Sequence, residues 1–383
     1  MTRPYLFLAA VFFLACDGAP RDVPMTGIGT PVDSLALPYT YISDAVHLGG
    51  NRWAFVAPNE RVAVIADLDS DSFTVLGGPR PTEYQEPFAI FRAGDSLYVS
   101  DWGKRSLTVW STDGAFGRAI PSASFVRGAL PRARDSQGRF YSAVHPPPRA
   151  DGSGSRDSAF IVMMSADFTR ADTVGLLAPP DMAEVMGQSG GRRYTPRAMS
   201  GRDEWGVLPD GRIWIARINQ NRIDRRSLDG KWRKGQPLPD RVLTVEEEDR
   251  QRFLLQFPEE LRRDAAQTPF AIIKPAFEAG FADQAGYVWL VKSFSLYDST
   301  RTAQVVDTAG RLTRQLEYRG FGRVAGTSGD RLLVAEMSDK GHRLLVYPVP
   351  AVQADLTALF PRHYPERPGV QAASTSAGRT EST

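Results

Sequence analysis

The stretch Ala93-Gly94-Asp95-Ser96-Leu97-Tyr98-Val99 decides the fold, because it recurs along the chain as a turn followed by a strand. Gly and Asp punctuate the turn, and the apolar and aromatic run after it is typical of a buried β-strand. The unit occurs six times in all, and the other copies are Gly49-Gly50-Asn51-Arg52-Trp53-Ala54-Phe55-Val56, Ser136-Gln137-Gly138-Arg139-Phe140-Tyr141, Pro209-Asp210-Gly211-Arg212-Ile213-Trp214-Ile215, Gln284-Ala285-Gly286-Tyr287-Val288-Trp289-Leu290 and Ser328-Gly329-Asp330-Arg331-Leu332-Leu333-Val334. Such self-similarity indicates a repeat architecture.

The spacing between the copies indicates what one repeat contains. Counted from the first apolar residue of each strand, successive copies lie 44, 43, 73, 75 and 44 residues apart. The short spacing is that of a four-stranded propeller blade, about 40–45 residues, and the two long spacings leave room for insertions. The sequence therefore predicts an all-β fold, a six-bladed β-propeller over residues 27–353.

A propeller has to close its ring, because an open array of sheets would leave one blade edge unpaired. The last unit supplies three strands and ends with the strand-like run His342-Arg343-Leu344-Leu345-Val346-Tyr347, before Pro348. We expect the N-terminal segment around residues 31–37 to donate the fourth strand of that blade.

One blade carries a family motif. The run Tyr98-Val99-Ser100-Asp101-Trp102-Gly103, followed by a strand that ends in Asp113-Gly114, resembles the NHL-like group of six-bladed propellers. In that group an Asp near the end of the second strand precedes a third strand ending in Asp-Gly. The resemblance spans residues 27–350 in pattern, although the other blades lack an equivalent of Asp101. It implies the fold and says little about an activity.

The longest insertion lies between the fourth and fifth units. Thr244-Val245-Glu246-Glu247 has the pattern of a helix capping box, and Phe253, Phe257 and Leu261 follow at four-residue spacing. The sequence predicts a helical insertion between blades four and five, over about residues 241–273, which Pro258 kinks or splits into two helices. Residues 145–157 and 179–200 are two further long excursions, and neither is expected to pack by itself.

The N-terminus has the features of an export signal. Residues 1–15 hold one charge, Arg3, and an apolar run too short to span a bilayer, which is typical of a signal peptide. Phe13-Leu14-Ala15-Cys16 resembles the lipobox of bacterial lipoproteins, which implies that Cys16 is lipidated and anchors the protein to a membrane of the cell envelope. Cys16 is the only cysteine. The alternative is an ordinary secretory signal with an incidental cysteine.

The lipobox implies a lipid-anchored protein on the periplasmic or outer surface, with residues 16–26 as its tether. At the other end, residues 354–383 are rich in Ser, Thr, Ala, Gly and Pro, and we expect most of this tail to be disordered. The formal net charge of +2 at pH 7 gives no argument for nucleic acid as a partner.

Sequence motifs for catalysis are absent: the four histidines show no metal-ligand spacing, and neither a P-loop nor a Gly-x-Ser-x-Gly elbow occurs. The enzymatic alternative is a calcium-dependent lactonase or esterase, since some six-bladed propellers hold calcium with oxygen ligands at the channel mouth. Acidic residues near the starts of innermost strands are the candidate ligands: Asp44, Glu86, Glu204, Glu278 and Asp283.

A basic cluster gives the other candidate site. Arginines crowd the third and fourth units, namely Arg132, Arg134, Arg192, Arg193, Arg197, Arg202, Arg212 and Arg217. They are expected to form salt bridges with the acidic helical insert; otherwise they make a patch for an anionic group. From this region we select Arg134, Arg197, Arg202 and Glu204 as candidate ligand-binding residues.

These observations favour a membrane-anchored binding or interaction protein of the bacterial cell envelope, without a cofactor and non-enzymatic, whose partner is a protein or a small molecule. The metal-dependent hydrolase is the alternative from another class, and three converging oxygen ligands would distinguish it. An accessory subunit of a larger envelope complex is a third hypothesis, which an apolar surface patch away from the channel would support.

Overall fold

The computed structural model describes residues 23–77, 84–147, 157–186, 192–255, 257, 259–320 and 322–351. The predicted signal peptide, the predicted lipid site at Cys16, Pro258 and the predicted disordered tail lie outside these residues. All elements described below belong to the unit that ends at Pro350.

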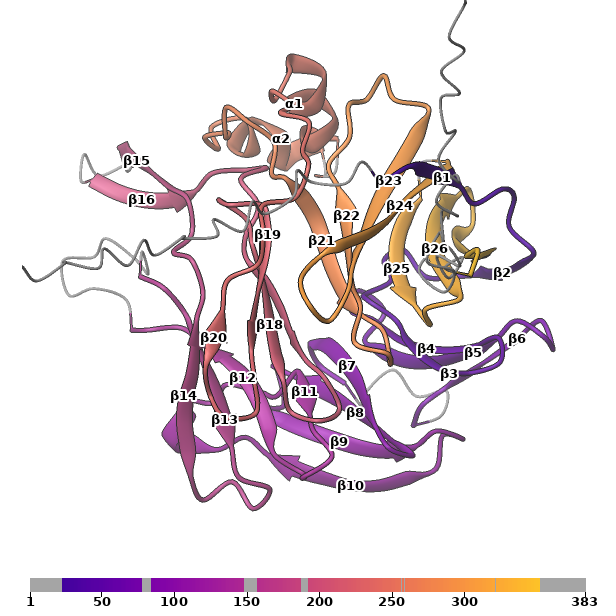
Figure 1. Cartoon of the computed structure of the whole chain (residues 1–383), viewed down its shortest axis with the longest axis vertical. Helices are drawn as coiled ribbons and strands as arrows, with labels where there is room; N and C mark the ends of the chain where they lie inside the picture. Colours follow the sequence, from indigo (N-terminus) through magenta and orange to yellow (C-terminus); the bar gives the residue numbers. More distant parts are fainter. Residues whose placement is uncertain are drawn as a thin grey trace, which may run out of the picture. The chain divides into compact units, whose positions relative to one another are not determined.

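Six antiparallel four-stranded sheets follow one another as blades in the described part of the chain (Figure 1). From the innermost strand outwards, blades one to three are β3 (Val46–Gly49), β4 (Arg52–Ala57), β5 (Val62–Asp67), β6 (Ser72–Val75); β7 (Pro87–Ala93), β8 (Ser96–Asp101), β9 (Ser106–Ser111), β10 (Phe116–Pro121); and β11 (Ala133–Arg134), β12 (Phe140–Val144), β13 (Phe160–Met164), β14 (Ala171–Leu176). Blades four to six are β17 (Glu204–Val207), β18 (Ile213–Arg217), β19 (Arg222–Arg226), β20 (Trp232–Arg233); β21 (Phe277–Ala282), β22 (Val288–Lys292), β23 (Thr300–Val306), β24 (Leu312–Arg319); and β25 (Arg323–Thr327), β26 (Arg331–Ser338), β27 (Gly341–Pro348), β2 (Asp33–Leu37).

The innermost strands form a closed circle. Contacts run from β3 to β7, β11, β17, β21 and β25, and from β25 back to β3. This order confirms the predicted six-bladed propeller.

The six repeated segments form the second strand of each blade, and the burial of these strands explains why their sequences are so apolar. These strands have neighbouring blades on both faces, so almost every residue is apolar. In β4, Trp53 and Phe55 face blade six, whereas Ala54 and Val56 face blade two. Clusters of this kind fill all six gaps between adjacent blades among the described residues.

Buried aspartates fix the turns of the repeat. In blade five, Asp283 accepts hydrogen bonds from the Tyr287 amide and from Trp289 Nε1, both at 3.0 Å. Asp101, which carries the family motif, is fully buried and accepts hydrogen bonds from the backbone amides of Gln85 and Glu86. These carboxylates satisfy amides that would otherwise lack partners, so their role in this fold is structural.

The N-terminal segment closes the ring as predicted. Strand β2 pairs antiparallel with β27, from Asp33 opposite Val346 to Leu37 opposite His342, and becomes the outer strand of blade six. Its inward side chains, Leu35 and Leu37, are almost completely buried. Strand β1 (Met25–Gly27) adds a parallel fifth strand to β24 of blade five, which the sequence did not predict.

The predicted helical insertion lies between β20 and β21, as α1 (Glu247–Leu254) and α2 (Glu259–Ala265). The capping prediction is wrong by two residues: Glu246 is the N-cap, and its amide donates to Asp249 at 3.0 Å. Thr244 instead pairs with Ile273 across the base of the insert. Leu261 was expected on the apolar face of the helix, but it is 50% exposed.

The excursion at residues 179–200 contains a two-stranded hairpin, β15 (Met182–Met186) with β16 (Arg192–Pro196). A short 3-10 helix, η1 (Ser124–Val126), follows blade two. Among the described residues, no helix is long and apolar enough to cross a membrane.

Candidate functional site

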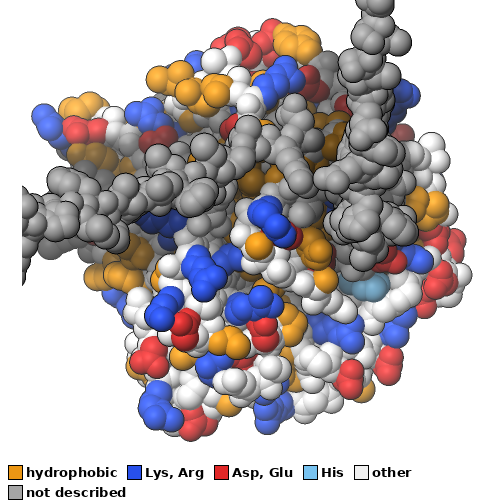
Figure 2. Space-filling view, viewed as in Figure 1, with side chains coloured by type: hydrophobic (Ala, Val, Ile, Leu, Met, Phe, Trp, Pro, Cys, Tyr) orange, Lys and Arg blue, Asp and Glu red, His pale blue; other side chains and the backbone are white. Residues whose placement is uncertain are grey.

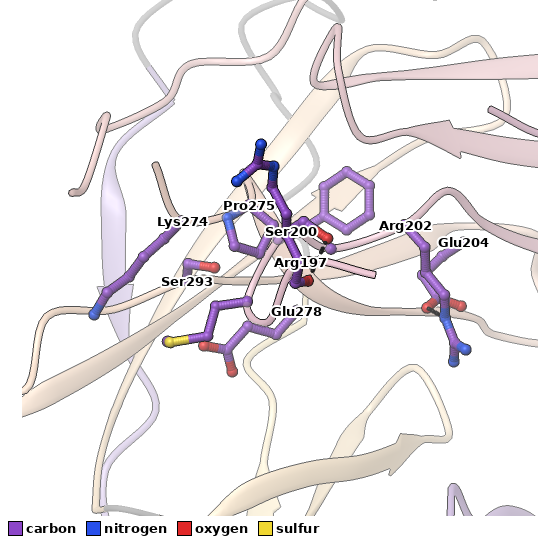
Figure 3. A pocket seen from close by; sticks show the side chains of 11 residues that line it. Arg197, Ser200, Arg202, Glu204, Lys274, Pro275, Glu278 and Ser293 are labelled. Carbon is purple, nitrogen blue, oxygen red and sulfur yellow. Dashed lines mark hydrogen bonds and ion pairs between the residues drawn. The ribbon is translucent and has the colours of Figure 1, made fainter. Parts of the chain in front are cut away.

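An open pocket of about 480 Å³ lies between blades four and five, beside the base of the helical insert (Figure 3). The loop that leads into β17 forms one wall, and the segment that leads into β21 forms the other. The lining residues are Arg197, Met199, Ser200, Gly201, Arg202, Glu204, Lys274, Pro275, Phe277, Glu278 and Ser293.

Close backbone packing holds the two walls together. The Ala198 amide donates to Pro269 O at 2.8 Å, and the Ala271 amide donates to Ala198 O at 3.0 Å. Gly201 has a φ of +71°, and a Cβ at this position would lie 2.4 Å from Pro275 Cβ. Only glycine combines that conformation with that approach, so Gly201 fixes the path of the pocket-lining loop.

A buried ion pair fastens the insert to the propeller next to the pocket. Lys274 Nζ lies 2.7 Å from Asp249 Oδ1 of α1 and donates to Phe294 O at 2.9 Å. Both charged side chains are at most 5% exposed. A buried pair of this kind holds together because each charge satisfies the other.

Arg202 and Glu204 lie together on one side of the pocket (Figure 3). Arg202 Nε donates to Glu204 Oε1 at 3.2 Å, and Arg202 itself is 76% exposed. Burial raises the pKa of Glu204, while the charges of Arg202 and Arg132 oppose this rise. Within the described part of the chain, the terminal amino groups of Arg202 donate no hydrogen bond, so they are available to a ligand.

Glu278 and Ser293 lie on the other side (Figure 3). Burial raises the pKa of Glu278, and the nearby charge of Arg301, at 3.8 Å, opposes this rise. The Arg301 guanidinium in turn lies over the Phe294 ring, 3.3 Å from its centroid. Among the described residues, no donor forms a hydrogen bond with the Glu278 carboxylate, and the buried hydroxyl of Ser293 has no partner.

A second pocket of about 530 Å³ adjoins the first and shares Arg197, Ser200, Lys274 and Pro275 with it. Its remaining lining residues are Asp181, Ile218, Asn219, Asp240, Ala271, Ile272, Ile273 and Ala276. Ile272 is 80% exposed.

Every charged side chain that lines either pocket has a partner of opposite charge. The pairs are Arg197 with Asp181, Arg202 with Glu204, Lys274 with Asp249, Arg301 with Glu278, and Lys292 with Asp240. The walls are thus rich in charged groups, and together with their partners these groups carry no net charge. The visible face of the molecule likewise has Lys and Arg interspersed with Asp and Glu (Figure 2).

The structure brings three of the four predicted ligand-binding residues together in the first pocket, namely Arg197, Arg202 and Glu204. Arg134 lies elsewhere. Its Nη1 donates to the Tyr98 hydroxyl at 2.6 Å, and its guanidinium lies over the Tyr98 and Phe140 rings. These contacts place it in the packing between blades two and three.

The expected pairing of the arginine cluster with the helical insert is wrong. Arg197 and Arg202 have the partners given above, and three more pair with carboxylates of their own region: Arg192 with Glu184, Arg212 with Asp210, and Arg217 with Asp203 and Asp224. Short sequence separation makes these contacts cheaper to form than contacts with the distant insert. The Arg193 side chain lies outside the described residues.

The predicted calcium ligands do not form a site. Asp44 pairs with Arg323 at 2.8 Å and Glu204 pairs with Arg202, so arginines already neutralise both carboxylates. Asp283 is occupied in its turn, six residues from Trp289, and Glu86 is an exposed residue before β7. Across the described ranges, no three His, Cys, Asp or Glu side chains come together as a metal ion would require. The hydrolase alternative therefore finds no ligand set among these residues.

Lys274, Ser293 and Asn219 line the pockets but were not predicted from the sequence. Lys274 directly follows the predicted insert, and its partner Asp249 lies 25 residues away. No local pattern marks such a pair. Ile272 and Ile273 could have pointed to a binding surface, because they are adjacent apolar residues outside any predicted strand.

Large exposed apolar side chains surround the insert, namely Val242, Leu255, Leu261, Ile272, Ile273 and Tyr297. All of these side chains lie outside the four-stranded blades, in the insert or in the loops beside it.

No protein-family model and no curated protein sequence matches the chain. Solved structures with a similar fold include a member of the DUF4221 family from Bacteroides vulgatus, with 9% identity, a TM-score of 0.48, and coverage of 83% of this chain and 96% of that one. Virginiamycin B lyase from Staphylococcus aureus has 10% identity, a TM-score of 0.45, and coverage of 82% and 98%. A calcium-binding regucalcin from Agrobacterium tumefaciens has 11% identity, a TM-score of 0.42, and coverage of 85% and 98%. These similarities assign no function, and the assignment of the fold rests on the sheets described above.

Proposed function

We propose that this protein is an exported, lipid-anchored and non-enzymatic binding protein, and that the pocket between blades four and five takes an uncharged polar ligand. The observation that carries this proposal is the pairing of every charged side chain that lines the site. A charged ligand would leave one member of a pair unmatched, which costs free energy in a partly buried site. An uncharged ligand leaves the pairs intact and still finds the free amino groups of Arg202 and the oxygens of Glu278.

The first described residue of the chain sets how far the proposed anchor would reach. Gln315 Nε2 donates to Val23 O at 2.6 Å, so the chain is attached to blade five from residue 23 onwards. Val23 is seven positions beyond Cys16, a reach of at most about 25 Å. Lipidation of Cys16 would therefore keep the pocket-bearing propeller close to a bilayer.

Replacing the lipid site tests the anchor. In cells that express the full chain, we expect the wild type in the membrane fraction after high-salt and carbonate washes, because buried acyl chains resist both. The Cys16→Ala variant should be released in soluble form or remain as an unprocessed precursor, and labelled palmitate should enter the wild type alone. An unlabelled wild type that fractionates like the variant would contradict the anchor.

Titration with three classes of probe tests the pocket. We expect uncharged oligosaccharides to bind with little dependence on salt, and anionic and cationic oligosaccharides of the same length to bind more weakly. Arg202→Gln and Glu278→Gln should each weaken binding about tenfold, since each removes a hydrogen bond to a charged group. Arg118→Gln and Glu260→Gln, at exposed positions outside the pocket, should leave affinity unchanged. Tighter binding of either charged probe would overturn the proposal.

A further inference from the structure

Two pockets lie next to each other and share four lining residues, and we call the pair the groove. Arg197 and Ser200 line both from one side, and Lys274 and Pro275 line both from the other. Ser293 and Glu278 line only the first pocket, and Asn219, in the turn between β18 and β19, lines only the second. Two adjoining pockets offer contacts to a ligand longer than one compact small molecule.

Part of the backbone along the groove walls is already engaged in hydrogen bonds. Peptides often bind by adding a strand to an open sheet edge. Here the Arg197 amide donates to Asp181 O, the Val245 amide to Ile272 O and the Lys274 amide to Leu243 O. The amides of Arg197 and Lys274 are thus not open to an added strand, and we infer the ligand class from the side chains.

Those side chains match hydroxyl groups. A hydroxyl both donates and accepts, so it can donate to the Glu278 carboxylate and accept from the free amino groups of Arg202. The buried Ser293 hydroxyl, which has no partner among the described residues, needs such a group. Asn219 supplies an exposed amide at the far end, and Ile218, Ile273 and Ala276 give an apolar wall for C–H faces.

We infer that the groove binds a linear, uncharged oligosaccharide, with one end at Glu278 and Ser293 and the chain continuing past Ser200 to Asn219. This inference rests on the proposed function and adds the class of ligand and its direction. An oligosaccharide that spans both pockets gains contacts with each added sugar residue until the groove is full.

The test uses the full chain on a printed array of neutral glycans sorted by length, beside uncharged peptides of matching lengths, followed by titration of the glycans that bind. Affinity should rise with glycan length and then level off. Asn219→Ala should weaken a long glycan about threefold to tenfold, the effect of one lost neutral hydrogen bond, and leave its shortest binding homologue unchanged. Ser293→Ala should weaken both. Unaltered thermal unfolding of each variant separates loss of contact from loss of fold.

Three other outcomes would overturn part or all of this inference. If short and long glycans bind equally and Asn219→Ala has no effect, the extended mode is overturned while the pocket proposal stands. If uncharged peptides bind and glycans do not, the ligand class is overturned. If no uncharged probe binds, both the inference and the proposed function fail.

Discussion

Truncating the two inward leucines of β2 is expected to remove most of the stability of the propeller. Leu35 and Leu37 are 3% and 2% exposed and belong to the cluster between blades six and one. Each Leu→Ala change at such a site costs about 2–5 kcal/mol, from the lost burial and the cavity left behind. The Leu35→Ala/Leu37→Ala double variant should therefore lose about 4–10 kcal/mol, a large share of the roughly 5–15 kcal/mol that native domains possess.

Urea unfolding followed by circular dichroism measures this effect. Ser34→Ala is the matched control, because Ser34 lies in the same strand with its side chain exposed, and such changes usually stay within about 0.5 kcal/mol. A double variant as stable as the control would show that β2 does not close the ring.

The second large effect is expected at the buried pair that fastens the insert. Lys274→Met leaves Asp249 buried without its partner, at a cost of about 3–5 kcal/mol. The Lys274→Met/Asp249→Leu double variant should recover much of this loss, because two apolar side chains need no pairing. Recovery will be incomplete, since Asp249 also accepts the Glu246 amide at the start of α1.

Lys231→Met is the control for the second prediction. Lys231 pairs with Asp229 at 3.3 Å, but both side chains are largely exposed, so the change should cost at most about 1 kcal/mol. Thermal unfolding gives the stability of all three variants, and limited proteolysis shows whether α1 detaches. If Lys274→Met resembles Lys231→Met in both measurements, the ion pair does not hold the insert in place.

The architecture could be predicted because one strand of each blade is buried on both faces. That burial makes the second strands continuous apolar runs after Gly- and Asp-containing turns, and a sequence shows this directly. The innermost strands carry a weaker signal: β11 has only two residues, and one of them is Arg134. The parallel pairing of β1 could not be predicted, because Met25, Thr26 and Gly27 contain no alternation that would specify a partner.

The candidate site was predictable only in part. Arg197, Arg202 and Glu204 lie within eight residues of one another, so the entry to blade four brings them together whatever the rest of the chain does. Arg134 was chosen for its charge alone, and the neighbouring Tyr98, which holds it in place, comes from another blade. Glu278 and Lys274 depend on the path of the insert, and a sequence pattern does not fix that path.

The most direct test of the account is hydrogen–deuterium exchange of the full chain with and without the uncharged glycan that binds it most tightly. We expect slower exchange in peptides that cover residues 199–204 and 274–279, because these segments form the two walls of the pocket. The repeated strands, which are already buried, should change little. Protection confined to another surface, such as the β15–β16 hairpin, or no protection under saturating glycan, would contradict the assignment of this pocket as the binding site.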